Sequence, residues 1–412
     1  MNNIDNNKKL FCIFCNKTPE KTKKLIIGLS GNICTQCVIF CYDTLKKIII
    51  YIKKREKNDL TSPYIIKKHL DKYIIGQEKA KKIFSVSVYN HYKKLKYIQE
   101  NKNNIELEKS NILLLGPTGS GKTLLAKTLA KYLNVPFAIA DATTLTQAGY
   151  VGEDVETILQ KLIENSNYDI KKAEKGIIYI DEIDKISKKS ENLSITRDVS
   201  GEGVQQSLLK IIEGTIATVP PKGSRKHPQE DLWKINTSNI LFICGGAFCN
   251  IDKIILKRVQ KTLGIGFHKK IKDINKIEKK ISKKEKIQPQ DLIKFGLIPE
   301  FVGRFPIIAN FDSLTQQNLI DILCQPKNSL IKQYQILFSL DNIQLEFDKE
   351  SLIEIAKQAV LKNTGARGLR ATLESILLNT MYDISILKNI KKVCINASVI
   401  KNKTAPKLIF SK

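Results

Sequence analysis

A glycine-rich stretch carries the clearest chemistry in this sequence. It reads Gly116-Pro117-Thr118-Gly119-Ser120-Gly121-Lys122-Thr123. Its G-x-x-x-x-G-K-T spacing is that of the phosphate-binding P-loop, in which glycines allow backbone N–H groups to turn inward around phosphate oxygens. Lys122 can reach the β- and γ-phosphates, and the Thr123 hydroxyl can ligate Mg²⁺. The stretch therefore predicts a binding site for a nucleoside triphosphate and its magnesium ion.

Two acidic residues, Asp181 and Glu182, follow an apolar run at 177–180. An Asp at a strand end beside a P-loop holds Mg²⁺, usually through water, and the next Glu can polarise a water for attack on the γ-phosphate. On its own, such a run could equally be a strand whose acids meet solvent. Downstream of a P-loop it favours triphosphate hydrolysis, with Lys122, Asp181 and Glu182 as catalytic residues.

Two arginines, Arg304 and Arg367, stand out because arginine is scarce in this chain. Phosphoryl transfer passes through a charged transition state, which an arginine supplied by a neighbouring subunit can stabilise. From the residues alone, a surface ion pair explains either arginine equally well.

Four cysteines near the N-terminus form two close pairs, Cys12 with Cys15 and Cys34 with Cys37. The C-x₂-C-x₁₈-C-x₂-C spacing predicts a Zn²⁺ site, and four thiolates make a closed tetrahedral site that is structural rather than catalytic. The rest of the 9 cysteines are scattered. This usage is typical of a reducing compartment with one metal site, not of a disulfide framework.

The elements that would position these residues can be read from the apolar pattern. An apolar run at 112–115 precedes the P-loop, which opens onto a helical pattern at 122–133. Later apolar runs alternate with helical patterns, which predicts an α/β fold with a mostly parallel sheet wrapped by helices. From about residue 314 the pattern is largely helical. We expect a zinc-binding module at 1–50, a linker at 51–62, a large α/β domain at 63–313 and a small α-rich domain at 314–412.

Length and charge limit the possible partners. The 412 residues are 42% hydrophobic and carry a net charge of +27, which raises the possibility of a nucleic-acid binder. The excess lysines, however, are spread along the chain, so solvated lysine-rich faces are the favoured explanation and nucleic acid is not an expected partner. No apolar run is long enough to span a bilayer, and the start has no secretory signal. We therefore expect a cytoplasmic protein without a membrane partner.

Further motifs run through the chain from end to end. They are the four-cysteine module, Ile74-Ile75-Gly76-Gln77, the P-loop, 140–146, 149–154, Asp181-Glu182-Ile183-Asp184, Arg225-Lys226-His227, Ile265-Gly266-Phe267, Gly303-Arg304 and Gly365-Ala366-Arg367-Gly368. On these residues the chain resembles the ClpX family of AAA+ unfoldases, which feed the ClpP protease. The resemblance implies an AAA+ P-loop NTPase with a parallel sheet, a small domain and a zinc module. It also implies a chaperone that uses ATP, Mg²⁺ and Zn²⁺ to unfold and translocate proteins.

The resemblance assigns roles to three loops. Tyr150 and Val151 would belong to the axial pore loop, where a tyrosine and a valine can grip any polypeptide through apolar contact. Arg225-Lys226-His227 would lie at the pore entrance and attract acidic chain termini. Ile265-Gly266-Phe267 would dock into ClpP. The expected partners are therefore ClpP, tagged or unfolded protein substrates, and adaptors.

The resemblance also assigns the remaining nucleotide contacts. Arg304 would be the arginine finger that reaches the ATP of a neighbouring subunit, which requires a ring, here a homohexamer. Arg367 would reach the ATP of its own subunit, and Ile74 and Ile75 would line the adenine pocket. The strand end 244–246 departs from the pattern, because it lacks the Asn or Thr with which many AAA+ proteins sense the γ-phosphate.

Three alternatives remain. An HslU-type unfoldase would lack the zinc module and the tripeptide at 265–267. A nucleic-acid motor or clamp loader would show ATPase activity that DNA or RNA stimulates with strong salt dependence. A zinc adaptor without activity would have no need of Lys122, Asp181 and Glu182.

Overall fold

The chain divides into two compact units, Met1–Thr61 and Ser62–Lys412. The computed structural model describes residues 11–18, 24–28, 31–58, 62–100, 105, 107–146, 153–188, 201–220, 232–262, 287–362, 364–386, 390–402 and 404–410. Three predicted loops lie outside the described residues, namely Tyr150-Val151, Arg225-Lys226-His227 and Ile265-Gly266-Phe267. Their roles stay predictions.

The N-terminal unit is a small β-hairpin followed by a helix. Strands β1 (Leu25–Ile27) and β2 (Asn32–Cys34) pair antiparallel, and helix α1 (Thr35–Asn58) follows directly. The chain thus stays helical through most of 51–62, the range expected to be a linker. Among the residues of this unit whose burial is described, only Cys12 and Cys34 are buried. So little apolar burial cannot hold a fold together, which makes a metal the expected source of stability.

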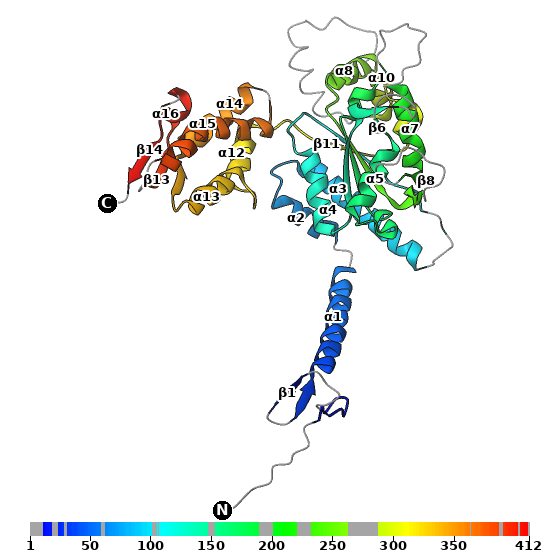
Figure 1. Cartoon of the computed structure of the whole chain (residues 1–412). Coiled ribbons are helices and arrows are strands. Elements are labelled where there is room, and N and C mark those ends of the chain that lie inside the picture. Colours follow the sequence, from blue (N-terminus) through cyan, green and yellow to red (C-terminus); the bar gives the residue numbers. More distant parts are fainter. Residues whose placement is uncertain are drawn as a thin grey trace, which may run out of the picture. The chain divides into compact units, whose positions relative to one another are not determined.

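The second unit is built on a five-stranded parallel sheet, which confirms the predicted α/β fold (Figure 1). Its strands, in spatial order, are β11 (Ile307–Asn310), β3 (Ile112–Leu115), β10 (Leu241–Gly246), β7 (Ile177–Asp181) and β4 (Phe137–Asp141). All residues of β3 and β10 are buried, as expected for central strands with both faces covered.

Alternate side chains of these strands enter two separate cores. On one face, Leu114 and Tyr179 pack with helices α2 (Pro63–Asp71), α3 (Glu78–Gln99) and α4 (Lys122–Leu133). On the other face, Leu115 and Ile180 pack with α5 (Glu156–Asn165), α7 (Glu202–Glu213), α10 (Pro289–Phe295) and α11 (Pro299–Gly303). The period-two alternation of each strand therefore anchors helices on both sides of the sheet.

Short elements connect these layers. They are β5 (Leu145–Thr146), β6 (Glu153–Asp154), α6 (Ile170–Ala173), β8 (Ile216–Val219), β9 (Trp233–Asn236) and α8 (Ile251–Thr262). The helical spacing that begins at Glu153 predicts a helix from there, but Glu153 and Asp154 pair with β5 instead. The helix consequently begins three residues later, at Glu156.

The residues after 313, which we call the C-terminal part, are mostly helical. Helices α12 (Gln316–Cys324) and α13 (Leu330–Leu340) are separated at Pro326, whose ring cannot continue a helix. They are followed by β12 (Gln344–Phe347), α14 (Lys349–Leu361), α15 (Ala366–Ile386), β13 (Ile390–Ile395), α16 (Ala397–Asn402) and β14 (Lys407–Phe410). These elements share a core of their own, in which Leu323, Ile355 and Leu373 are fully buried.

Candidate nucleotide-hydrolysis site and zinc centre

The P-loop connects β3 to α4 in a backbone conformation that requires glycine. Gly116, Gly119 and Gly121 have φ values of 148°, 73° and 101°. A Cβ at Gly116 would also lie 2.5 Å from the carbonyl oxygen of Phe311. These positive φ values, which residues with a Cβ rarely adopt, shape the loop that leads into the start of α4, where the helix dipole favours an anion.

Lys122 lies in this loop with its ammonium group held by the backbone. Its Nζ donates to the carbonyl oxygens of Gly116 at 2.6 Å and Pro117 at 3.0 Å. Burial lowers the pKa of Lys122, and the charge of Asp181 opposes that effect. The Ser120 hydroxyl is buried and has no hydrogen-bond partner among the described residues. A cation held only by carbonyl groups and an unpaired buried hydroxyl fit a site for phosphate oxygens.

Thr123 and Asp181, the two predicted Mg²⁺ ligands, are in contact. The Thr123 hydroxyl donates to Oδ2 of Asp181 at 2.8 Å. The other carboxylate oxygen, Oδ1, accepts from the backbone N–H of Glu182 at 3.0 Å and from the Tyr179 hydroxyl at 3.2 Å. Oxygen donors of this kind suit Mg²⁺, so the residues fit the ion that the sequence predicts.

Glu182 has an unusual backbone conformation. Its φ is 55°, in the left-handed region that residues with a Cβ rarely adopt. The turn follows the last residue of β7 and leaves Glu182 lining the same cavity as Lys122. Strained backbone of this kind is concentrated at functional sites. Glu182 is recognisable from its place after the apolar run, whereas its backbone strain leaves no mark in the sequence.

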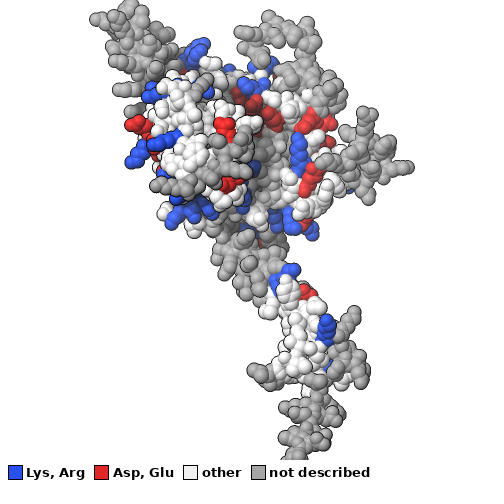
Figure 2. Space-filling view, turned by 60° about the vertical axis from the view of Figure 1, so that its left-hand side comes forward, with Lys and Arg blue, Asp and Glu red and all other residues white. Residues whose placement is uncertain are grey.

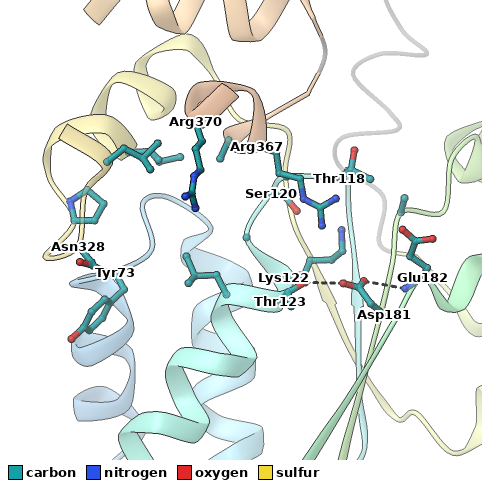
Figure 3. A pocket seen from close by; sticks show the side chains of 18 of the residues that line it. Tyr73, Thr118, Ser120, Lys122, Thr123, Asp181, Glu182, Asn328, Arg367 and Arg370 are labelled. Atoms are coloured by element: carbon teal, nitrogen blue, oxygen red, sulfur yellow. Dashed lines mark hydrogen bonds between the residues drawn. The ribbon is translucent and has the colours of Figure 1, made fainter. Parts of the chain in front are cut away.

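These side chains line a cavity of about 660 Å³ that has walls from both parts of the second unit. Besides the P-loop and the acid pair, Tyr73, Asp184 and Cys249 contribute from the α/β part, and Ile322, Pro326, Asn328, Arg367 and Arg370 contribute from the C-terminal part. Figure 3 shows Arg367 extending from α15 toward the P-loop, opposite Lys122. The volume is in the range of small-molecule sites, and both polar and apolar groups face it.

The predicted adenine contacts lie beside this cavity. Ile74 is buried in the core beneath α3, and the lining includes Tyr73 but neither Ile74 nor Ile75. Gln77, at the start of α3, exchanges two hydrogen bonds with the backbone of Asp312, at 2.7 Å and 2.8 Å. The segment 74–77 is thereby tied to the chain that leads into the C-terminal part.

Arg304 lies away from the cavity of its own chain. Its guanidinium pairs with Glu213 on α7, with a distance of 2.6 Å between the Arg304 Nη2 and Glu213 Oε1 atoms. The Arg304 side chain is 53% exposed, and its backbone carbonyl accepts from the Asn111 side chain. The guanidinium is therefore accessible to another molecule.

Asp184, for which the sequence predicts no role of its own, is buried at the cavity. Its Oδ1 accepts the backbone N–H of Ala247 at 2.9 Å, which links the turn after β7 to the end of β10. A Cβ at Gly246 would lie 2.9 Å from this oxygen, so the glycine leaves room for the carboxylate. The only signal in the sequence was an acid two residues after Glu182.

The four predicted zinc ligands come together in the N-terminal unit. The Sγ atoms of Cys12, Cys15, Cys34 and Cys37 all lie within 4.8 Å of one another. Burial disfavours the Cys12 thiolate, but backbone N–H groups, chiefly that of Cys34 at 3.2 Å, outweigh it and lower the pKa of Cys12 to about 6. Burial and the neighbouring thiols raise the pKa of Cys37. Four converging sulfurs that cannot all be charged without a cation fit a structural Zn²⁺ ion.

A P-loop after β3 and an acid pair at the end of β7, two strands away in the same parallel sheet, define the class of P-loop NTPases. Three family models match the chain: the AAA domain (Cdc48 subfamily) over 107–308, the ClpX C4-type zinc finger over 10–47, and the C-terminal, D2-small domain, of ClpB protein over 314–396. The ATP-dependent Clp protease ATP-binding subunit ClpX of Treponema denticola is 54% identical over 403 residues, which cover 97% of this chain and 96% of that protein. The chain therefore belongs to the ClpX family of AAA+ ATPases.

This membership confirms the resemblance seen in the sequence. The chain is an ATPase with an ATP-binding AAA domain and a four-cysteine zinc finger. None of the helices in the described ranges is long and apolar enough to cross a membrane.

Proposed function

We propose that the chain is an ATP-dependent unfoldase and translocase that delivers proteins to a ClpP peptidase. The observation that carries the proposal is the shared cavity, in which the P-loop and the acid pair face Arg367 from α15. A nucleotide bound there would touch both parts of the unit, so its hydrolysis would change how they are arranged. The name of the relative, an ATP-binding subunit of the Clp protease, supports the link to proteolysis.

In this proposal the P-loop residues 116–123 surround the phosphates of ATP. Lys122 would exchange its two carbonyl partners for phosphate oxygens. Thr123 and Asp181 would hold Mg²⁺, which when bound neutralises phosphate charge. Tyr73, with Ile74 and Ile75 behind it, would lie on the adenine side.

Glu182 would act as the general base that takes a proton from the attacking water. Arg367 would contact the ATP of its own subunit and stabilise the charge on the γ-phosphate. Arg304, exposed and remote from its own cavity, would reach the ATP of the next subunit. A residue supplied in this direction around a closed ring requires a heterologous assembly, for which we propose a homohexamer.

A direct contact between the P-loop and the C-terminal part supports mechanical coupling. The backbone N–H of Ala366 donates to the carbonyl oxygen of Gly119 at 3.2 Å. A Cβ at Gly365 would lie 2.9 Å from the carbonyl oxygen of Thr118, so the two backbones touch with no room for a side chain. A change in the P-loop would therefore be transmitted to α15.

The remaining roles belong to loops outside the described residues. Tyr150 and Val151 would grip the polypeptide, Arg225-Lys226-His227 would attract its end, and Ile265-Gly266-Phe267 would dock on ClpP.

Native domains are stable by only about 5–15 kcal/mol, so repeated pulling on one end can unfold them. The zinc finger would recognise substrates or adaptors. The cysteine pattern, with one four-cysteine cluster and the others scattered, supports the cytoplasm as the compartment.

The charge of the chain motivates the strongest competing function, a nucleic-acid motor. Figure 2 shows, on the face drawn, Lys and Arg side chains dispersed among Asp and Glu rather than gathered in one patch. A dispersed arrangement favours solubility over phosphate tracking.

ATPase activity measured with two kinds of added polymer separates these functions. We expect an unfolded, tagged polypeptide to stimulate ATP turnover and DNA or RNA to leave it unchanged. Stimulation by nucleic acid alone, falling steeply with salt, would overturn the unfoldase proposal.

A further inference from the structure

The end of strand β10 poses a structural question that the proposed mechanism leaves open. It reads Cys244-Gly245-Gly246 and offers no side chain to the nucleotide. Strand β10 nevertheless lies between β3 and β7, directly between the P-loop strand and the acid-pair strand. Because Gly245 has no side chain, it leaves space next to β7, and a side chain of that strand fills it.

The group that fills this space is the phenol of Tyr179 on β7. A Cβ at Gly245 would lie 2.1 Å from the Tyr179 hydroxyl oxygen and 2.8 Å from the ring carbon that carries it. No residue with a Cβ can occupy position 245 while the Tyr179 ring keeps this position. Tyr179 is fully buried and pairs in register with Ile243, two residues before Gly245 on the same face of the sheet.

The hydroxyl reaches the two groups that would hold the metal. It donates to Oδ1 of Asp181 at 3.2 Å, and its oxygen lies 3.4 Å from the Thr123 hydroxyl. Tyr179 is fully buried and is not among the residues that line the cavity, so its hydroxyl lies behind the two predicted metal ligands. In the bond to Asp181 the phenol is the donor, because a carboxylate oxygen only accepts.

We propose that Tyr179 is a positioning residue for the metal site, and that Gly245 is glycine to make room for its hydroxyl. The Oδ1 atom of Asp181 is occupied by the phenol and by the backbone N–H of Glu182, which fixes the rotation of the carboxylate. The Oδ2 atom then faces Thr123, whose hydroxyl donates to it at 2.8 Å. Groups that orient metal ligands in this way commonly contribute about 10–100-fold to metal affinity. The inference rests on the proposed role of Asp181 in holding Mg²⁺.

The test measures Mn²⁺ binding to the full chain saturated with ADP. Binding is measured as the loss of the free Mn²⁺ signal in electron paramagnetic resonance. Tyr179→Phe keeps the ring and removes only the hydroxyl. We expect it to weaken Mn²⁺ binding about tenfold, at the lower end of that range because the hydrogen bond is long. ADP affinity in EDTA should stay the same. The matched control is Tyr92→Phe, which removes a hydroxyl bonded to the carbonyl oxygen of Lys175 outside the cavity.

A second variant tests the part played by glycine. Gly245→Ala should displace the ring and weaken Mn²⁺ binding as Tyr179→Phe does. If both substitutions act through the Tyr179 hydroxyl, the Mn²⁺ affinity of the double variant should be no lower than that of the single variant with the lower affinity. Losses that multiply would contradict a shared cause.

Asp181→Asn separates this inference from the proposed function. If that variant binds Mn²⁺ normally, the proposed metal role of Asp181 is wrong. If Asp181→Asn binds weakly while Tyr179→Phe matches the Tyr92→Phe control, only the positioning role is wrong. Two further results for Tyr179→Phe would overturn the positioning role. They are the loss of its thermal unfolding transition and a loss of ADP affinity that is the same in EDTA as with metal, because the hydroxyl would then serve stability instead.

Discussion

Asp181 and Glu182 are neighbours in the chain, yet the structure prepares them for different tasks. Asp181 closes a regular strand, and both of its carboxylate oxygens accept hydrogen bonds. Glu182 turns into the left-handed region at φ 55°, and no hydrogen bond to its carboxylate is found among the described residues. A fixed carboxylate suits a metal ion, whereas an unbound one can accept a proton from water.

The variant Glu182→Gln tests the assignment at the residue scale. The amide keeps the shape of the side chain but cannot take a proton, so ATP should bind normally while hydrolysis falls by about 10²–10⁴-fold. Equilibrium binding of a fluorescent ATP analogue and phosphate release under single-turnover conditions measure the two steps. Glu350→Gln, an exposed change in the first turn of α14, is the control. Normal turnover by Glu182→Gln would remove Glu182 as the base.

At the scale of elements, the features that depend on residues close together in the sequence could be predicted, and those that depend on distant residues could not. Strands β3, β7 and β10 were predictable because each is an apolar run next to glycine or charged residues. The P-loop and the zinc ligands were predictable because their chemistry depends on fixed local spacing. Strand β11 is four residues long and only partly buried at Ile307 and Ile308, so its pattern gives little signal.

The role of Tyr179 could not be predicted for a different reason. Its partner Gly245 is far away in the sequence and becomes a neighbour only when β10 inserts between β3 and β7. The same holds for Arg304 and Glu213, which meet through the packing of α11 and α7. Contacts that depend on strand order or helix packing leave no periodic mark in one sequence.

Zinc removal tests the independence of the N-terminal unit. Because only Cys12 and Cys34 are buried among the residues of this unit whose burial is described, Cys34→Ser should release zinc and expose residues before 62 to proteolysis. The second unit has its own cores, so ATPase activity should stay within about twofold of the parent chain. Zinc content, protease fragments and phosphate release measure the three effects. Cys41→Ser, whose residue lies outside the sulfur cluster, should keep its zinc. Loss of ATPase activity in step with zinc would show that the two units are not independent.

At the scale of the whole molecule, each hydrolytic site in the proposed ring is built by two chains. Lys122→Ala lacks a working P-loop but keeps Arg304, and Arg304→Ala has the reverse defect. Each variant alone should be inactive, and an equal mixture should regain about a quarter of the parental sites, because one pairing of neighbours in four is complete. Glu213→Gln, which frees Arg304 from its ion pair, should stay active. An Arg304→Ala protein that hydrolyses ATP alone, or a mixture that stays inactive, would contradict sharing.

The most direct test of the account is the degradation of a folded, tagged fluorescent protein by this chain together with a ClpP peptidase. With ATP, fluorescence should fall and peptides should appear. Glu182→Gln should abolish both, and deletion of Ile265 to Phe267 should abolish the peptides while ATP turnover continues. Persistence of the folded protein during normal ATP turnover, or degradation without ATP, would contradict an ATP-driven unfoldase.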